Sequence, residues 1–121
     1  MEKLTPQEAV AMSVIWQVGE GNVKIFLQQL NNKVPYTTFA STIKNLERKG
    51  FLTSRLVGNV YLYKPIVKES VYKKTFLREI VKGHFNNSYK NLVNFFVDQK
   101  SITPRELKEI IALIEKGNKQ P

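Results

Sequence analysis

Hydroxyl, amide and cationic side chains are concentrated between residues 36 and 61, and their spacing suits contact with a polyanion. Thr37, Ser41, Lys44 and Arg48 recur at i, i+4, i+7 and i+11, which places them on one face of a helix. Hydroxyl and amide groups hydrogen-bond the edges of bases, whereas lysine and arginine bind phosphates. We therefore predict DNA contacts from this helix and the segment after it, by Tyr36, Thr37, Thr38, Ser41, Lys44, Asn45, Arg48, Arg55, Asn59 and Tyr61.

Catalytic chemistry is not supported by the remaining residue types. His84 is the single histidine, and no paired carboxylates lie near it in the sequence. A catalytic triad or a metal centre requires partners, so His84 is predicted to be a surface or packing residue. The chain has no cysteine, no phosphate-binding glycine loop and no metal-ligand spacing. We expect a protein that is not an enzyme and that needs neither a metal nor a cofactor.

The net charge indicates the same class of partner. The chain carries 19 Lys and Arg against 10 Asp and Glu, a formal charge of +9. Such an excess favours nucleic acid first and an anionic membrane second. Between Lys44 and Lys64 there are five basic residues and one acidic residue, so the bias coincides with the predicted contact residues. A well-solvated basic surface without a partner is the plainer interpretation of the same charges.

The distribution of apolar residues disfavours a membrane protein. Apolar residues make up 42% of the chain, but no run reaches the roughly 20 residues of a transmembrane helix. In a predicted helix at 68–82, Tyr72, Phe76 and Ile80 suit packing against neighbouring helices better than contact with lipid. We expect a soluble, cytoplasmic protein without membrane insertion.

A pattern of helix, helix, turn, helix and hairpin positions the predicted contact residues. The three helices are predicted at about 6–18, 22–30 and 36–49, from capping residues and apolar residues at helical spacing. Gly58-Asn59 then separates two β-prone runs at 52–57 and 60–64, which is a strong hairpin signal. This order is that of the winged helix-turn-helix. We predict a mainly α-helical protein whose residues 1–66 form a winged-helix DNA-binding domain.

Three further amphipathic helices are predicted after the hairpin. They fall at about 68–82, 88–97 and 103–117. Three short, one-sided helices can barely enclose a core alone, so pairing with a second copy is expected. Residues 67–121 are therefore predicted to form a helical dimerisation domain. The residues favoured for the dimer interface are Tyr72, Phe76, Leu92, Phe96, Ile110 and Ile114.

A set of motif residues along the chain matches a known family. They are Leu4, Thr5, Glu8, Met12, Ile15, Trp16, Gly19, Tyr36, Thr37, Thr38, Ser41, Ile43, Leu46, Lys49, Gly50, Gly58, Tyr61, Tyr63, Pro65, Tyr72, Phe85, Ser88, Leu92, Val93 and Phe96. In order and spacing they resemble the penicillinase repressor family, the BlaI/MecI type. The resemblance implies a homodimeric transcriptional repressor that binds an inverted-repeat operator in double-stranded DNA. Such members typically silence genes for β-lactamase or an altered cell-wall transpeptidase.

The resemblance also implies how repression is relieved. In such repressors a membrane sensor protease cleaves the fifth helix, and loss of the dimer releases the operator. The corresponding region here is Asn94, Phe95 and Phe96, in which the Asn-Phe pair lies one residue earlier than in the family. Ala40 and Asn45 replace residues that are commonly basic in the reading helix of the family, and both differences bear on the operator sequence.

A second class of function fits the same spacing. Wings of this kind also serve as protein docking surfaces, so the alternative prediction is a winged-helix protein-association module without sequence-specific DNA binding. Salt dependence discriminates between the two. Each phosphate that the protein neutralises adds about 0.9 to the steepness of the plot of log affinity against log salt concentration. A protein interface of mixed polar and apolar character gives a shallow slope.

Overall fold

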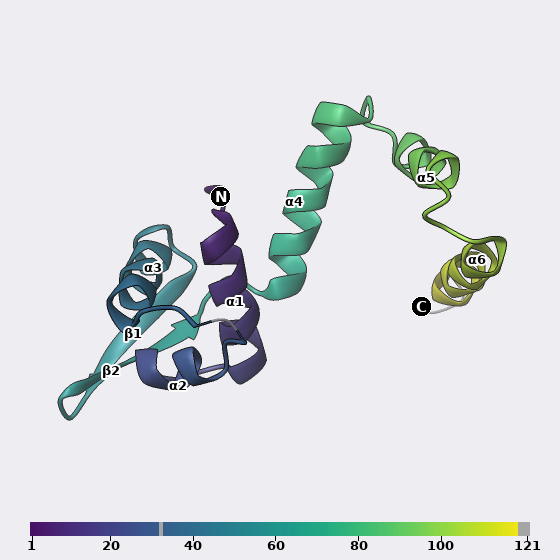
Figure 1. The fold of residues 1–121 in the computed structure, drawn as a ribbon. Coiled ribbons are helices and arrows are strands. Elements are labelled where there is room, and N and C mark those ends of the chain that lie inside the picture. Colours follow the sequence, from purple (N-terminus) through teal and green to yellow (C-terminus); the bar gives the residue numbers. More distant parts are fainter. Residues whose placement is uncertain (32, 119–121) are drawn as a thin grey trace. The chain divides into compact units, whose positions relative to one another are not determined.

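The computed structural model describes residues 1–31 and 33–118 and confirms the predicted mainly helical fold with a β-hairpin (Figure 1). In these ranges the elements are α1 (Pro6–Val18), α2 (Val23–Gln28), α3 (Tyr36–Arg48), β1 (Leu52–Val57), β2 (Val60–Pro65), α4 (Glu69–His84), α5 (Tyr89–Asp98) and α6 (Pro104–Asn118). The chain divides into two compact units, the first of which is Met1–Lys73.

Local hydrogen bonds explain where the first two helices begin. The Thr5 hydroxyl accepts from the Glu8 backbone at 3.1 Å, and the Glu8 carboxylate accepts from the Thr5 backbone at 2.9 Å. This reciprocal pair is the capping box expected before α1. The Asn22 side chain accepts from the backbone of Ile25 at 2.8 Å and starts α2 in the same way.

The hairpin is antiparallel and is joined to the turn between α1 and α2. Its register runs from Leu52 opposite Pro65 to Val57 opposite Val60, and the connecting Gly58 has φ of 62°. Gly21 extends the pairing, because it donates to the Tyr63 carbonyl at 3.0 Å and accepts from its N–H at 2.8 Å. A Cβ at Gly21 would lie 3.2 Å from side-chain atoms of Ile25 and Phe26, so only glycine fits this approach without displacing a neighbour.

The core of the first unit is formed between the three helices and the hairpin. Its buried residues are Ala11, Met12, Val14, Ile15, Phe26, Phe39, Ile43, Leu46, Phe51, Leu52 and Tyr63. Glu8 is also buried, and its carboxylate accepts a hydrogen bond of 2.5 Å from Lys49 at the end of α3. A charged pair between α1 and α3 therefore lies beside an apolar core.

The boundary between the units falls later than the sequence predicted. The Trp16 indole donates to the carbonyl of Val67 at 2.8 Å, and the Tyr72 ring lies 5.6 Å from Trp16 and 5.7 Å from Phe51. The first turn of α4 thus packs in the first unit, which ends at Lys73 rather than at residue 66. Tyr72, predicted at a dimer interface, packs against its own winged-helix domain.

This packing predicts that a fragment 1–73 is more stable than a fragment 1–66. Loss of the Tyr72 ring and the Val67 acceptor removes apolar burial and aromatic contacts worth about 2–4 kcal/mol. Urea unfolding of both fragments, followed by Trp16 fluorescence, measures the difference. Tyr72→Ala in the longer fragment should remove most of it, and equal midpoints for the two fragments would contradict the assignment.

The second unit, which begins at Lys74, has little internal core. Among its residues up to 117, Val81 is the only one that is buried. Large apolar side chains on α5 and α6 are exposed, among them Phe96 and Ile110. No helix within the described ranges is both long and apolar enough to span a membrane.

Candidate nucleic-acid interface

Helix α3 carries a polar ridge, formed by Thr37, Ser41, Lys44 and Arg48, on the side opposite the core. Phe39, Ile43 and Leu46 are buried. At 100° per residue, Thr37, Ser41, Lys44 and Arg48 all fall within about 50° of the direction opposite those three side chains, and all four are exposed. A helix held by one face and carrying hydroxyls and cations on the other is suited to lie in a major groove.

The two flanks of α3 carry the other predicted contact residues of the helix. Thr38 and Asn45 are exposed on the flank toward α1, where Thr38 lines a groove of about 460 Å³. Tyr36 is exposed on the opposite flank, toward the hairpin. The ridge is therefore bordered on both sides by groups that can reach a ligand lying along it.

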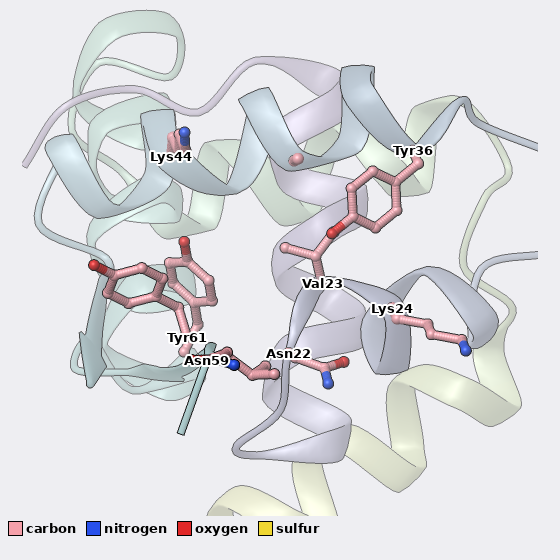
Figure 2. Close-up of a pocket in the computed structure, with 10 residues that line it drawn as sticks. Asn22, Val23, Lys24, Tyr36, Lys44, Asn59 and Tyr61 are labelled. Atoms are coloured by element: carbon pink, nitrogen blue, oxygen red, sulfur yellow. The ribbon is translucent and has the colours of Figure 1, made fainter. Parts of the chain in front are cut away.

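A hollow of about 450 Å³ lies between the start of α2, α3 and the hairpin (Figure 2). Its lining residues are Asn22, Val23, Lys24, Tyr36, Ala40, Lys44, Asn59, Val60, Tyr61 and Tyr63. Four of them were predicted as DNA contacts, and the hollow brings these four together: Tyr36, Lys44, Asn59 and Tyr61. These described lining residues include two lysines and no carboxylate, so the hollow suits an anionic group.

Sequence reasoning missed three polar residues of this hollow. Asn22 caps α2, and Lys24 and Tyr63 lie on elements whose sequence patterns indicate structure rather than binding. The backbone hydrogen bonds between Gly21 and Tyr63 place Asn22 and Lys24 close to the hairpin. The sequence around α2 could not identify Asn22 and Lys24 as part of this hollow, because β2, which they meet there, lies about 40 residues further along the chain.

The hydroxyl of Tyr63 remains a hydrogen-bond donor over the physiological pH range. Burial raises the pKa of Tyr63, and repulsion by the negative charge of Glu47, and by Tyr61 and Tyr36 when they are ionised, raises it further. Tyr36, Tyr61 and Tyr63 all line the hollow. The Ser54 hydroxyl also donates to Glu47, which joins β1 to α3.

Arg55, a predicted DNA contact, is engaged by a carboxylate of its own chain. Its Nε donates to Glu20 Oε2 at 3.2 Å and its Nη2 to Glu20 Oε1 at 3.0 Å. Hydrogen bonding with Arg55 is the main reason that the pKa of Glu20 is lowered. Because side chains alternate along β1, Arg55 projects to the face opposite Ser54, away from α3. The structure thus separates Arg55 from the residues that it gathers at the hollow.

Arg48 has only a weak competing partner. Its guanidinium lies 3.9 Å from the carboxylate of Glu2, and both side chains are more than half exposed. Exposed pairs of this kind contribute little and are readily exchanged. Arg48 is therefore available to a phosphate, as is Lys44. No group of three potential metal ligands occurs within the described ranges.

The sequence and the fold were compared with known proteins. A family model described as Penicillinase repressor matches residues 4–116. The chain belongs to this family. The penicillinase repressor of Bacillus licheniformis is 22% identical over 115 residues, covering 93% of this chain and 90% of the relative. The methicillin resistance regulatory protein MecI of Staphylococcus aureus (strain N315) is 23% identical over 120 residues, 94% of each.

A solved structure of the DNA-binding domain of a repressor is also similar to this penicillinase repressor family member. The DNA-binding domain of the repressor BlaI, determined in solution, superimposes with a TM-score of 0.52 at 27% sequence identity. The match covers 60% of this chain and 94% of that domain. Together with the family, it identifies the chain as a winged-helix transcriptional repressor and confirms the predicted class of fold and function.

Proposed function

We propose that this repressor binds an inverted-repeat operator in double-stranded DNA as a homodimer in the cytoplasm. The observation that carries the proposal is the ridge of α3, which is exposed directly opposite the core. Helix α3 lies in the major groove, where Thr37 and Ser41 meet base edges and Lys44 and Arg48 meet phosphates. Thr38 and Asn45 contact the strand on the flank toward α1.

The hollow of Figure 2 extends this surface toward the hairpin. Lys24 and Lys44 stand on two of its walls, and Tyr36, Asn59 and Tyr61 supply hydrogen-bond donors. The DNA strand that leaves the major groove runs past this hollow, with a phosphate beside the lysines. The wing then reaches the adjacent minor groove.

Dimerisation is proposed through the second unit. A helical unit with one buried residue among those described cannot be stable by its own apolar core. The exposed apolar residues of α4, α5 and α6 supply the missing burial when a second copy packs against them. The interface then contains Phe76, Leu92, Phe96, Ile110 and Ile114.

Relief of repression is proposed to follow cleavage in α5. The named relatives act in penicillinase and methicillin resistance, so genes for β-lactam resistance or the cell wall are the proposed targets. A membrane sensor protease is the proposed partner, and Asn94, Phe95 and Phe96 form the proposed cleavage region. All three residues are exposed in the monomer.

The cleavage proposal predicts that Asn94→Ala and Phe95→Ala each slow proteolysis at least tenfold. Both substitutions alter the side chains next to the proposed scissile bond, and both sites are exposed, so the effect on folding is small. Mass spectrometry of fragments formed by the sensor protease measures the rate and the bond. Asn91→Ala, one turn earlier, serves as the control, and cleavage of all variants at the wild-type rate would contradict the proposal.

Selection from a random pool of duplex DNA at near-physiological salt tests the function itself. Specific binding stands above non-specific background by about a thousandfold or more, so an inverted repeat should be enriched. If Lys24, Lys44 and Arg48 of both copies bind phosphates, six contacts give a slope of log affinity against log salt of about −5. A shallow slope and no enriched sequence, with folded dimer present, would instead favour the protein-association module.

Two substitutions on α3 should have different consequences. Arg48→Ala removes a phosphate contact, so we expect binding to weaken evenly across sequences and the salt slope to fall by about 0.9 per half-site. Ser41→Ala removes a group that meets base edges, so we expect base preference to change with the salt slope retained. Binding assays over a panel of operator variants measure both effects. Equal losses on every sequence for both variants would show that Ser41 does not read bases.

A further inference from the structure

The strand ends on either side of the Gly58-Asn59 turn are uncharged and largely apolar. Leu56, Val57, Val60 and Tyr61 are 58%, 46%, 44% and 55% exposed, and the sequence has no charged residue from 56 to 63. Figure 1 shows the hairpin extending beyond α1, α2 and α3 of its own unit. Clustered exposed apolar side chains on a projecting element indicate an interaction site.

The pairing register makes this tip apolar on both faces. Leu56 lies opposite Tyr61 and Val57 lies opposite Val60. Successive cross-strand pairs project to opposite faces of a hairpin, so each face carries one apolar pair. A flat partner covers only one face, whereas a narrow slot with two apolar walls covers both. The minor groove of DNA is such a slot, because deoxyribose rings line both of its walls.

The position of the tip supports the same occupant. Val60 and Tyr61 line the hollow whose opposite wall is α3, so the tip continues the surface proposed to follow a DNA strand. The nearest cation of the wing, Arg55, is held by Glu20 and projects away from α3. The tip therefore contributes apolar contact rather than phosphate neutralisation.

We propose that Leu56, Val57 and Val60 enter the minor groove beside each half-site and select A·T pairs there. The inference rests on the proposed function, since it requires α3 in the adjacent major groove. In the minor groove a G·C pair differs from A·T by the guanine N2 amino donor. Valine and leucine side chains offer that donor no acceptor, so burying it against them costs binding energy. Apolar side chains also occur at the minor-groove contacts of other DNA-binding proteins.

Inosine gives a direct test, because it presents the major-groove pattern of guanine but lacks the N2 amino group. In the operator recovered by selection, pairs flanking each half-site are replaced one at a time by A·T, G·C and I·C. Under the wing, we expect A·T and I·C duplexes to bind alike and G·C duplexes to bind about tenfold more weakly, as an unpaired buried donor requires. Equal binding of the G·C and I·C duplexes would overturn the inference.

The variant Val57→Thr with Val60→Thr links the discrimination to the wing. Threonine keeps the β-branched shape and places a hydroxyl where the guanine amino group can find an acceptor. We expect the G·C penalty to shrink to about twofold while the salt slope stays unchanged, since no charge is altered. Val10→Thr, at an exposed site on α1, is the matched control and should retain the full penalty.

Three outcomes separate this inference from the proposed function. An operator that is enriched, with a steep salt slope and the expected inosine pattern, supports both. An enriched operator whose G·C penalty persists in the double variant overturns the wing assignment and leaves the repressor function standing. If no duplex is enriched and the salt slope is shallow, the proposed function fails and the inference fails with it.

Discussion

The variant Phe96→Asp is expected to sediment as a monomer and to bind the operator at least 100-fold more weakly than the wild-type protein. Phe96 is 38% exposed on α5, in a unit where Val81 alone is buried among residues 74–117. A carboxylate at this position would have to be buried against apolar side chains in the dimer, which is strongly unfavourable. A monomer engages one half-site and loses the gain of about 10²–10⁴ that linking two contacts provides.

Sedimentation velocity, circular dichroism and operator binding test the dimer interface together. Ile110→Asp changes a different helix, α6, and should have the same effect if both residues lie in one interface. Gln99→Glu adds the same charge at an exposed position just after α5 and should remain dimeric. Retained helicity shows that the monomers are folded. An intact dimer in both aspartate variants would place the interface elsewhere.

Lys49→Met is expected to destabilise the winged-helix unit by about 3–5 kcal/mol, because removal of one partner leaves a buried charge unpaired. The side chains of Lys49 and Glu8 are 10% and 5% exposed. Lys49 donates to Glu8 at 2.5 Å and to the Lys3 carbonyl at 2.8 Å, so it holds the start of α1 against the end of α3. In a domain of this size the loss corresponds to a fall in Tm of about 15–30 °C.

The wild-type protein and Lys49→Met should respond to acidification in opposite directions. In the wild-type protein burial raises the pKa of Glu8, but hydrogen bonds and attraction from Lys49, with hydrogen bonds to Thr5, lower it below its ordinary value of 4.5. The stability that the ionised Glu8 contributes is therefore present above pH 4.5 and is lost as the pH falls through the lowered value. In Lys49→Met, burial without the cation should raise the pKa of Glu8, so protonation on acidification should favour the folded state.

Chemical unfolding of the two proteins between pH 3 and pH 7 measures both effects. The double variant Glu8→Gln with Lys49→Met removes the charge along with its partner and should recover much of the lost stability. The exposed pair Glu69–Lys73 on α4 supplies the control, because Lys73→Met should change stability by less than about 0.5 kcal/mol. If Lys49→Met lowers the free energy of unfolding no more than Lys73→Met does, the buried pair does not hold α1 to α3.

Features encoded by neighbouring residues could be predicted from the sequence. The capping box of Thr5 and Glu8, the Asn22 cap and the turn at Gly58 each depend on groups within about four residues, and all are present in the structure. The exposed ridge of α3 follows from a helical period that places Phe39 and its core partners on the other side. Local chemistry and a single period are enough to fix such features.

The tertiary structure decided the contacts between residues far apart in the sequence. The Trp16 indole donates a hydrogen bond to the carbonyl of Val67, 51 positions away in the sequence. This contact helps to place the first turn of α4 in the winged-helix unit. Glu20 lies 35 positions from Arg55, and the tertiary structure pairs this predicted DNA contact with a carboxylate of its own chain. No sequence periodicity links such positions, because their separation depends on how the elements pack.

The sequence by itself determined a basic, winged-helix chain with a reading helix and a hairpin. Its helical and twofold periods, caps and turn residues all agree on that fold. Only the tertiary structure assembled the hollow from three elements, paired Glu8 with Lys49 and showed the wing tip to be apolar on both faces. The physical reason is that a binding surface is defined by side chains meeting across elements, and those meetings arise from packing rather than from local preference.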